Sequence, residues 1–149
     1  MAKYLDNTGV QYLWKKIKAY VDDKIPSSTG VTIEHKKTTL NTYGDYTEYL
    51  KFSDGTLIVT MKYAHLDSVE YKWGNVYVTK NHSGDKYPVS FISEPVVQIS
   101  CEGREDDRLC GALISSKGSK TNSPSYRLWK GDNSTTNNDV TLLAIGRWK

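Results

Sequence analysis

Residues 46–63 read YTEYLKFSDGTLIVTMKY, two runs rich in aromatic and β-branched residues on either side of Asp54 and Gly55. An Asp-Gly pair tolerates positive φ at both central positions, which a two-residue type I′ turn requires. We therefore predict a β-hairpin whose register places Ser53 opposite Thr56. Because side chains alternate along a strand, this register puts one apolar set on a single face: Leu50, Phe52, Leu57, Val59 and Met61.

The opposite face of this hairpin is mixed in polarity and carries Tyr49, Lys51, Ile58 and Thr60. One apolar face and one mixed face are typical of a strand pair in an antiparallel sandwich. The central glycine and the β-branched content argue against a buried helix. Further short strands, at the spacing of a sandwich, are predicted over 31–40, 71–80, 89–92, 96–101, 109–115, 125–130 and 140–148.

Residues 8–25 are predicted to form an α-helix. Thr8 can cap its start, Gln11 can complete a capping box, and Pro26 ends it. A helix this short is marginal in water, so it must pack on its own β-domain or on the same helix of sister chains. We favour sister chains, with these apolar residues along a trimer axis: Val10, Leu13, Ile17 and Tyr20.

The sequence PSSTG at 26–30 has the composition of a linker. We therefore divide the chain into an N-terminal helix and linker, 1–30, and a β-sandwich head domain, 31–149. The predicted fold class is mainly β, with an N-terminal α-helix followed by an antiparallel β-sandwich.

Composition excludes several classes of protein. The net charge of +3 is not concentrated on one basic face, so nucleic-acid binding is not expected. No run of about 20 apolar residues predicts a membrane span, and the start of the chain lacks the apolar core of a signal peptide. With 11 Tyr against 2 Phe, we expect apolar surface to be buried between chains, because Tyr suits wet interfaces.

Catalytic motifs are not found. The three histidines, His35, His65 and His82, are scattered along the chain, and none has a partner at metal-ligand spacing. Phosphate-binding loops, GxGxxG and GxSxG are absent. The acidic residues of 102–107 could supply a carboxylate pair for glycoside cleavage, but a charged loop is more often a solvated surface. We expect no enzymatic activity, no cofactor and no metal.

Cys101 and Cys110 flank this charged loop and could face each other across a hairpin. A disulfide between them is geometrically possible. Two cysteines are too few for a disulfide framework, and folding in a reducing cytoplasm favours two buried thiols.

The remaining functional signal is for carbohydrate binding. Sugars are held by planar hydrogen-bonding groups and an aromatic platform, which the loops 102–108 and 131–139 and Trp129 could supply. Trp129 could equally pack in a subunit interface, whereas Trp73 and Trp148 are expected in the core. If these loops do not bind, the faces around Tyr49 and Tyr71 are the next candidates. The candidate residues are Arg104, Asp107, Arg108, Trp129, Asp132 and Asn133.

Three stretches resemble the C-terminal head domains of phage tail fibres, a group similar to the H-type lectin sandwich: YLKFSDGTLIV at 49–59, YPVSFISEPVVQISC at 87–101 and LLAIGRWK at 142–149. The opening at 3–25 resembles helical segments that begin modules in tail proteins of phages of Gram-positive gut bacteria. Val59-Thr60-Met61 stands where those domains usually have Trp-Gly.

This resemblance implies a six-stranded sandwich that trimerises in a virion tail assembled in the cytoplasm of a bacterial host. It implies binding of a host surface glycan without cleavage, at a site between subunits, and contacts with other phage tail proteins. The alternatives are a purely structural tail or baseplate protein that docks other virion proteins and, less favoured, a glycan hydrolase.

Overall fold

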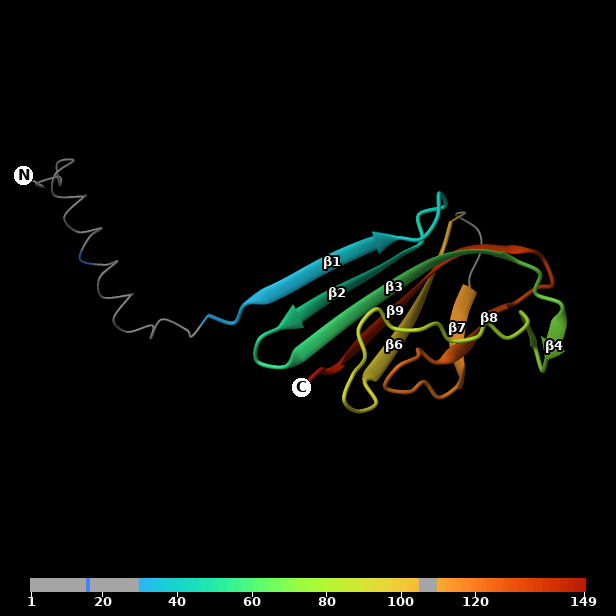
Figure 1. Ribbon diagram of the computed structural model, residues 1–149. Helices are drawn as coiled ribbons and strands as arrows, with labels where there is room; N and C mark the ends of the chain where they lie inside the picture. The colour runs from blue at the N-terminus through green and yellow to red at the C-terminus, as the bar shows by residue number, and fades with distance from the viewer. Residues whose placement is uncertain (1–15, 17–29, 105–109) are drawn as a thin grey trace, which may run out of the picture. The chain divides into compact units, whose positions relative to one another are not determined.

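The computed structural model describes residue 16, residues 30–104 and residues 110–149 (Figure 1). The chain divides into two units, Met1–Thr32 and Ile33–Lys149, and the nine strands found among the described residues belong to the second. The strands are β1 (Ile33–Thr39), β2 (Tyr46–Phe52), β3 (Thr56–Asp67), β4 (Tyr71–Trp73), β5 (Val76–Val78), β6 (Val96–Gly103), β7 (Cys110–Ser116), β8 (Ser125–Lys130) and β9 (Thr136–Arg147). None of the described residues belongs to a helix with the length and hydropathy of a membrane span.

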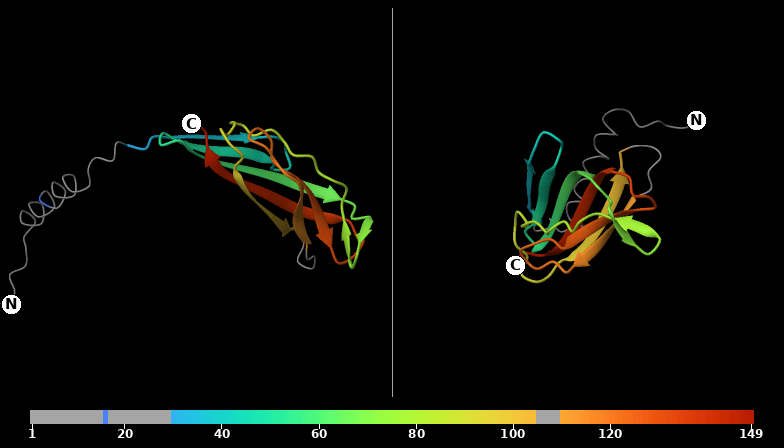
Figure 2. Two further views of the ribbon diagram at one scale, coloured as in Figure 1. Left: turned by 90° about the horizontal axis from the view of Figure 1, so that it is seen from below. Right: turned by 90° about the vertical axis from the view of Figure 1, so that its right-hand side faces the viewer.

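The strands form two antiparallel sheets. The first has five strands in the order β1-β2-β3-β9-β6, and the second has four in the order β4-β5-β8-β7. In the first sheet β3 and β9 are paired over 12 residues each, from Thr56 opposite Arg147 to Asp67 opposite Thr136. Figure 2 shows β1, β2, β3 and β9 side by side along this sheet.

The core lies between the two sheets. Alternation along the strands turns Leu57, Val59 and Met61 of β3 inward, where they are almost completely buried. Burying a side chain of this kind stabilises the fold by about 1.5–3 kcal/mol. The same cluster contains Tyr126 and Leu128 of β8, Val140, Leu142 and Ala144 of β9, and Tyr87 and Phe91 of the segment between β5 and β6.

The predicted hairpin forms from β2 and β3, but its register differs by one residue. Tyr49, not Leu50, is opposite Val59. No described non-glycine residue has positive φ, whereas Gly55 has a φ of 98°. A type I′ turn needs positive φ at both central positions, so the residues 53–55 form a three-residue loop that ends in a left-handed glycine.

A one-residue shift moves every side chain of a strand to the other face. Tyr49 therefore lies in the core, while Leu50 and Phe52 lie on the outer face of the five-stranded sheet. The predicted inward positions are right for the three residues of β3 and wrong for these two residues of β2.

The predicted fold class is wrong in its helical part, because every element of the described chain is a strand. The helix was predicted over 8–25, which lies outside the described residues apart from Lys16, and so do Val10, Leu13, Ile17 and Tyr20. Helical periodicity is a weak guide here, since a helix of this length needs a packing partner to be stable.

Two smaller predictions also fail, and one geometric possibility is not realised. The residues 89–92 belong to no strand, in a segment bounded by Pro88 and Pro95, which cannot donate to a ladder. The predicted strand 71–80 is instead the short hairpin β4–β5, which turns at Gly74 with a φ of 61°. Cys101 and Cys110 do not face each other across one hairpin, because β6 and β7 belong to different sheets.

Candidate functional site

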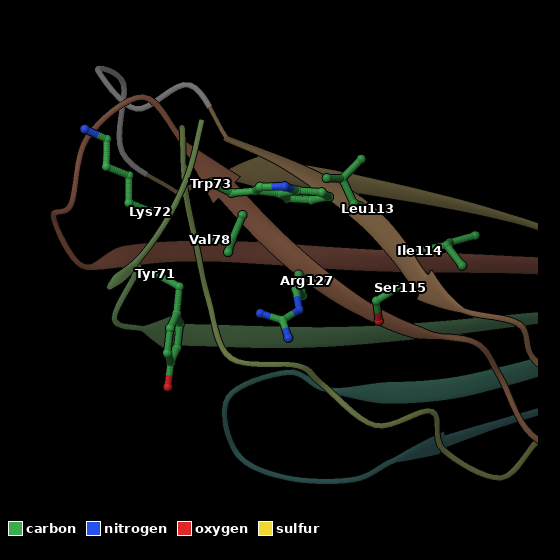
Figure 3. A pocket seen from close by; sticks show the side chains of 8 residues that line it. All are labelled: Tyr71, Lys72, Trp73, Val78, Leu113, Ile114, Ser115 and Arg127. Atoms are coloured by element: carbon green, nitrogen blue, oxygen red, sulfur yellow. The ribbon is translucent and has the colours of Figure 1, made fainter. Parts of the chain in front are cut away.

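A hollow of about 430 Å³ lies on the outer face of the four-stranded sheet (Figure 3). On β8, Tyr126, Leu128 and Lys130 point into the protein, so Arg127 and Trp129 between them point outward. The volume is within the range of small-molecule sites. Eight residues line the hollow: Tyr71, Lys72, Trp73, Val78, Leu113, Ile114, Ser115 and Arg127.

Two aromatic side chains of β4 are presented to solvent at this hollow. Trp73 is 62% exposed and Tyr71 is 55% exposed. Both stand on a short hairpin that pairs with β8, and the register places Tyr71 in one row with Val78 and Trp129. Large aromatic rings on a paired strand form a fixed apolar platform with polar edges.

A cation lies between the walls of the hollow. Arg127 Nη1 donates a hydrogen bond to the carbonyl oxygen of Thr79 at 3.2 Å, which holds the guanidinium in place. Figure 3 shows the Arg127 side chain between Tyr71 and Ser115, with the Trp73 ring lying toward Leu113. The aromatic rings can stack on the apolar side of a sugar ring, and the arginine beside them can donate hydrogen bonds to its hydroxyl groups.

Trp129 lies on this same outer face, but it is only half exposed. It is directly opposite Gly111 of β7, where a Cβ atom would lie 2.3 Å from Trp129 Nε1. The indole therefore covers the backbone of Gly111, and Trp129 lies on the same sheet face as the hollow without lining it. Trp73, expected in the core, is the exposed ring, whereas Trp148 packs against the core and donates from Nε1 to the Phe52 carbonyl at 2.8 Å.

Asp132 closes the turn that follows β8. Its carboxylate accepts hydrogen bonds from the Ser134 hydroxyl at 2.5 Å and the Ser134 N–H at 2.9 Å, and these bonds lower the pKa of Asp132 to about 2. Lys130, almost fully buried, donates from Nζ to Ser134 Oγ at 2.5 Å and lies 3.3 Å from Asp132 Oδ1. Asp132 is thus tied to a buried cation, and Asn133 beside it is exposed.

Arg104, which follows β6 in the predicted loop 102–108, contacts the first residues of β9, where the predicted loop 131–139 becomes a strand. The Arg104 N–H donates to the carbonyl of Asn137 at 3.0 Å, and Arg104 Nη2 pairs with Asp139 Oδ1 at 2.5 Å. Asp139 also pairs with Lys62 at 2.8 Å. Asp107 and Arg108 lie outside the described residues, and no described contact brings the other predicted residues into the hollow of Tyr71 and Arg127.

A second cluster joins residues that are far apart in the sequence. His65, Asp67 and His82 each offer a donor atom, and these atoms all lie within 4.8 Å of one another. Burial lowers the pKa of both imidazoles, and the negative charge of Asp67 opposes this shift only in part. Sequence spacing missed this cluster, because its members are brought together by tertiary structure.

No protein-family model and no curated protein matches this chain. Its fold resembles that of the N-truncated R1-type pyocin tail fibre, with a TM-score of 0.58 and 15% identity over 86% of this chain and 94% of that one. It also resembles a C-terminal part of the P. aeruginosa R1 pyocin fibre, with the same TM-score and identity, over 86% of this chain and 31% of that one. At this identity the likeness shows a shared fold.

Proposed function

We propose that this chain is a phage or prophage tail-fibre component that binds carbohydrate on the host surface without cleaving it. Two observations support the proposal: the fold shared with an R1-type pyocin tail fibre and the aromatic hollow of the four-stranded sheet. The observation that carries the binding role is the exposure of Trp73 and Tyr71 beside Arg127. The finer resemblance to H-type lectins and the place in a virion tail stay predictions.

Exposed rings of this size leave apolar area in water unless something covers them. A sugar covers such a ring with its C–H face and leaves its hydroxyl groups at the edge, where Arg127 and Ser115 line the hollow. Single contacts of this kind are weak, on the order of a millimolar dissociation constant, or about −4 kcal/mol. Several copies on one fibre would raise the effective affinity through avidity.

We propose in addition that the chain forms a homotrimer. The outer face of the five-stranded sheet supports this, because a row of apolar side chains crosses four of its strands: Leu50, Ile58, Ile145 and Val96. Val96 and Ile145 are exposed at the end of this row. Contact with a second copy would remove this area from water.

The alternative is a structural tail protein whose hollow and apolar sheet face dock other virion proteins. The same exposed surface favours it, since aromatic residues and arginine are also common at protein interfaces. The two roles differ in what the exposed surface binds: a glycan in the first case and another virion protein in the second. A glycan hydrolase would release sugar from cell-wall polysaccharide, which the proposed binding protein leaves intact.

Binding to a glycan array and to host cells tests the proposal. Trp73→Ala and Arg127→Ala are expected to weaken binding by at least about tenfold, or about 1.4 kcal/mol. Tyr43→Ala is the matched control, because Tyr43 is an exposed aromatic residue, 75% accessible, that does not line the hollow. Binding that survives both variants but falls with Arg104→Ala or Asp132→Ala would move the site to the polar loops. Absence of binding to any glycan would favour the docking role.

A further inference from the structure

The cluster of His65, Asp67 and His82 has the geometry of a metal site. Asp67 Oδ2 lies 3.3 Å from His65 Nδ1 and 3.3 Å from His82 Nε2. Two ligands that each lie 2.0–2.1 Å from a tetrahedral zinc ion are about 3.3–3.4 Å apart. The distances from Asp67 Oδ2 to the two imidazole nitrogens therefore match two edges of a zinc tetrahedron, and all three donor atoms lie within 4.8 Å of one another.

We propose that His65 Nδ1, Asp67 Oδ2 and His82 Nε2 bind one Zn²⁺ ion, with the fourth position taken by water. Two imidazoles and one carboxylate suit Zn²⁺ and related transition ions, whereas Ca²⁺ and Mg²⁺ prefer sites made of oxygen ligands. None of the three proposed ligands lines the hollow of Tyr71 and Arg127, although Asp67 and Tyr71 line one neighbouring cavity. The proposal does not depend on carbohydrate binding.

Neighbouring groups hold both imidazoles in the required orientation. The second ring nitrogen of His65, Nε2, lies 2.6 Å from the hydroxyl oxygen of Tyr126. An N–H donated to this oxygen leaves the Nδ1 lone pair directed at the proposed ion, as outer partners do in known metal sites. The ring of His82 stacks on Tyr126, with centroids 5.1 Å apart and planes 23° apart.

The charge of the cluster also favours a cation. Asp67 Oδ2 is buried and accepts no hydrogen bond from any described residue. A buried polar atom without a hydrogen-bond partner is costly. Metal binding requires an ionised carboxylate and neutral imidazoles, which these three side chains can supply. A divalent ion would supply the missing positive charge.

An ion at this position would connect the two sheets. His65 and Asp67 belong to β3 of the five-stranded sheet. His82 exchanges two backbone hydrogen bonds with Tyr126 of β8, at 2.8 and 3.0 Å, and so moves with the four-stranded sheet. Binding that requires the folded arrangement stabilises the folded state.

The test uses the full chain, freed of metal with a chelator and then titrated with Zn²⁺ alone. We expect one zinc per chain by elemental analysis, a rise in the thermal midpoint, and visible absorption bands when Co²⁺ replaces Zn²⁺. Asp67→Asn should abolish these signals, and Tyr126→Phe should weaken affinity by roughly 10–100-fold through lost orientation. His35→Gln is the matched control, because His35 is an exposed imidazole on β1 and the remaining histidine of the chain.

Wild-type protein that takes up no zinc at micromolar concentration would overturn the proposal, whatever the variants do. Equal uptake by the wild type and Asp67→Asn would overturn it too, as would loss of zinc in His35→Gln. If Asp67→Asn does not fold, the wild-type stoichiometry and the Tyr126→Phe affinity decide the outcome.

Discussion

Gly55 sets the register of the β2–β3 hairpin. Its φ of 98° lies in the left-handed region, which glycine adopts without steric strain because it has no Cβ atom. Its N–H donates to the Phe52 carbonyl at 3.0 Å, which closes a loop that begins at Ser53, one residue earlier than the predicted two-residue loop. Tyr49 reaches the core and Leu50 the outer face through this single backbone conformation.

Gly55→Val is expected to destabilise the fold by about 1–3 kcal/mol, because a β-branched residue resists positive φ. A Cβ atom here would also lie 2.5 Å from Arg147 Nη2, although that flexible side chain can move. Urea denaturation measures the change in the free energy of unfolding. Gly55→Asn is the control, since Asn tolerates this conformation better and should cost less. Equal costs for the two variants would mean that crowding, not φ, dominates.

Asp132 makes a pH-dependent contribution at the scale of a single residue. Its folded-state pKa of about 2 is below the ordinary value of 3.8, so its contribution is present above about pH 4 and is lost as the pH falls toward 2. Asp132→Asn should therefore lower the thermal midpoint near neutral pH, with the difference from wild type vanishing by about pH 2. Glu70→Gln, which removes another exposed carboxylate, is the control. A difference that does not change with pH would contradict the prediction.

At the scale of elements, the pairing of β7 with β8 depends on one close approach. Trp129 lies across Gly111, so β7 can present no side chain at this position. Burial of Gly111 itself contributes little to the free energy of folding, because glycine has no side chain. The Trp129 ring covers the backbone at this position, on the sheet face that carries the hollow. The residue predicted to bind sugar thus stabilises the strand pair that carries the hollow.

Gly111→Val should force Trp129 to move and cost about 1–3 kcal/mol, the usual penalty of overpacking. Denaturant unfolding measures the loss, and near-ultraviolet circular dichroism should report the displaced indole. Gly131→Val is the matched control, because nothing lies within 4 Å of a Cβ atom at Gly131. A Gly111→Val protein as stable as Gly131→Val would show that the indole does not need this position.

At the scale of the β-domain, one row of apolar side chains crosses the outer face of the five-stranded sheet. The face arises because Leu50 and Phe52 point away from the core and join Ile58, Ile145 and Val96 on that side. A monomer would leave this row in water, whereas an assembly of copies would bury it.

Light scattering at micromolar concentration is expected to show a trimer. Ile145→Glu should yield monomers, because burying an unpaired carboxylate in an interface is strongly unfavourable. Ile114→Glu is the control: Ile114 is 46% exposed and Ile145 is 44% exposed, but Ile114 lies on the other sheet. A monomeric wild type would contradict the proposed trimer, and a trimeric Ile145→Glu protein would place its interface elsewhere.

The sequence alone determined the local features of this protein. Alternation along β3 identified Leu57, Val59 and Met61 as core residues, and Asp54-Gly55 marked the turn between two strands. Short strands separated by polar turns indicated two antiparallel sheets. Each of these patterns depends only on residues close together in the chain, so it can be recognised without knowledge of the tertiary structure.

Tertiary structure decided what distant segments do to one another. β9 lies between β3 and β6, His82 meets His65 and Asp67, and the short β4 leaves Trp73 in water. The apolar character of Trp73 led to a predicted core position. That prediction was wrong because the sequence does not reveal which face of a strand is covered by other parts of the protein. Register, sheet order and convergent side chains come from pairing between residues far apart in the chain, whose free energy depends on the whole packed structure.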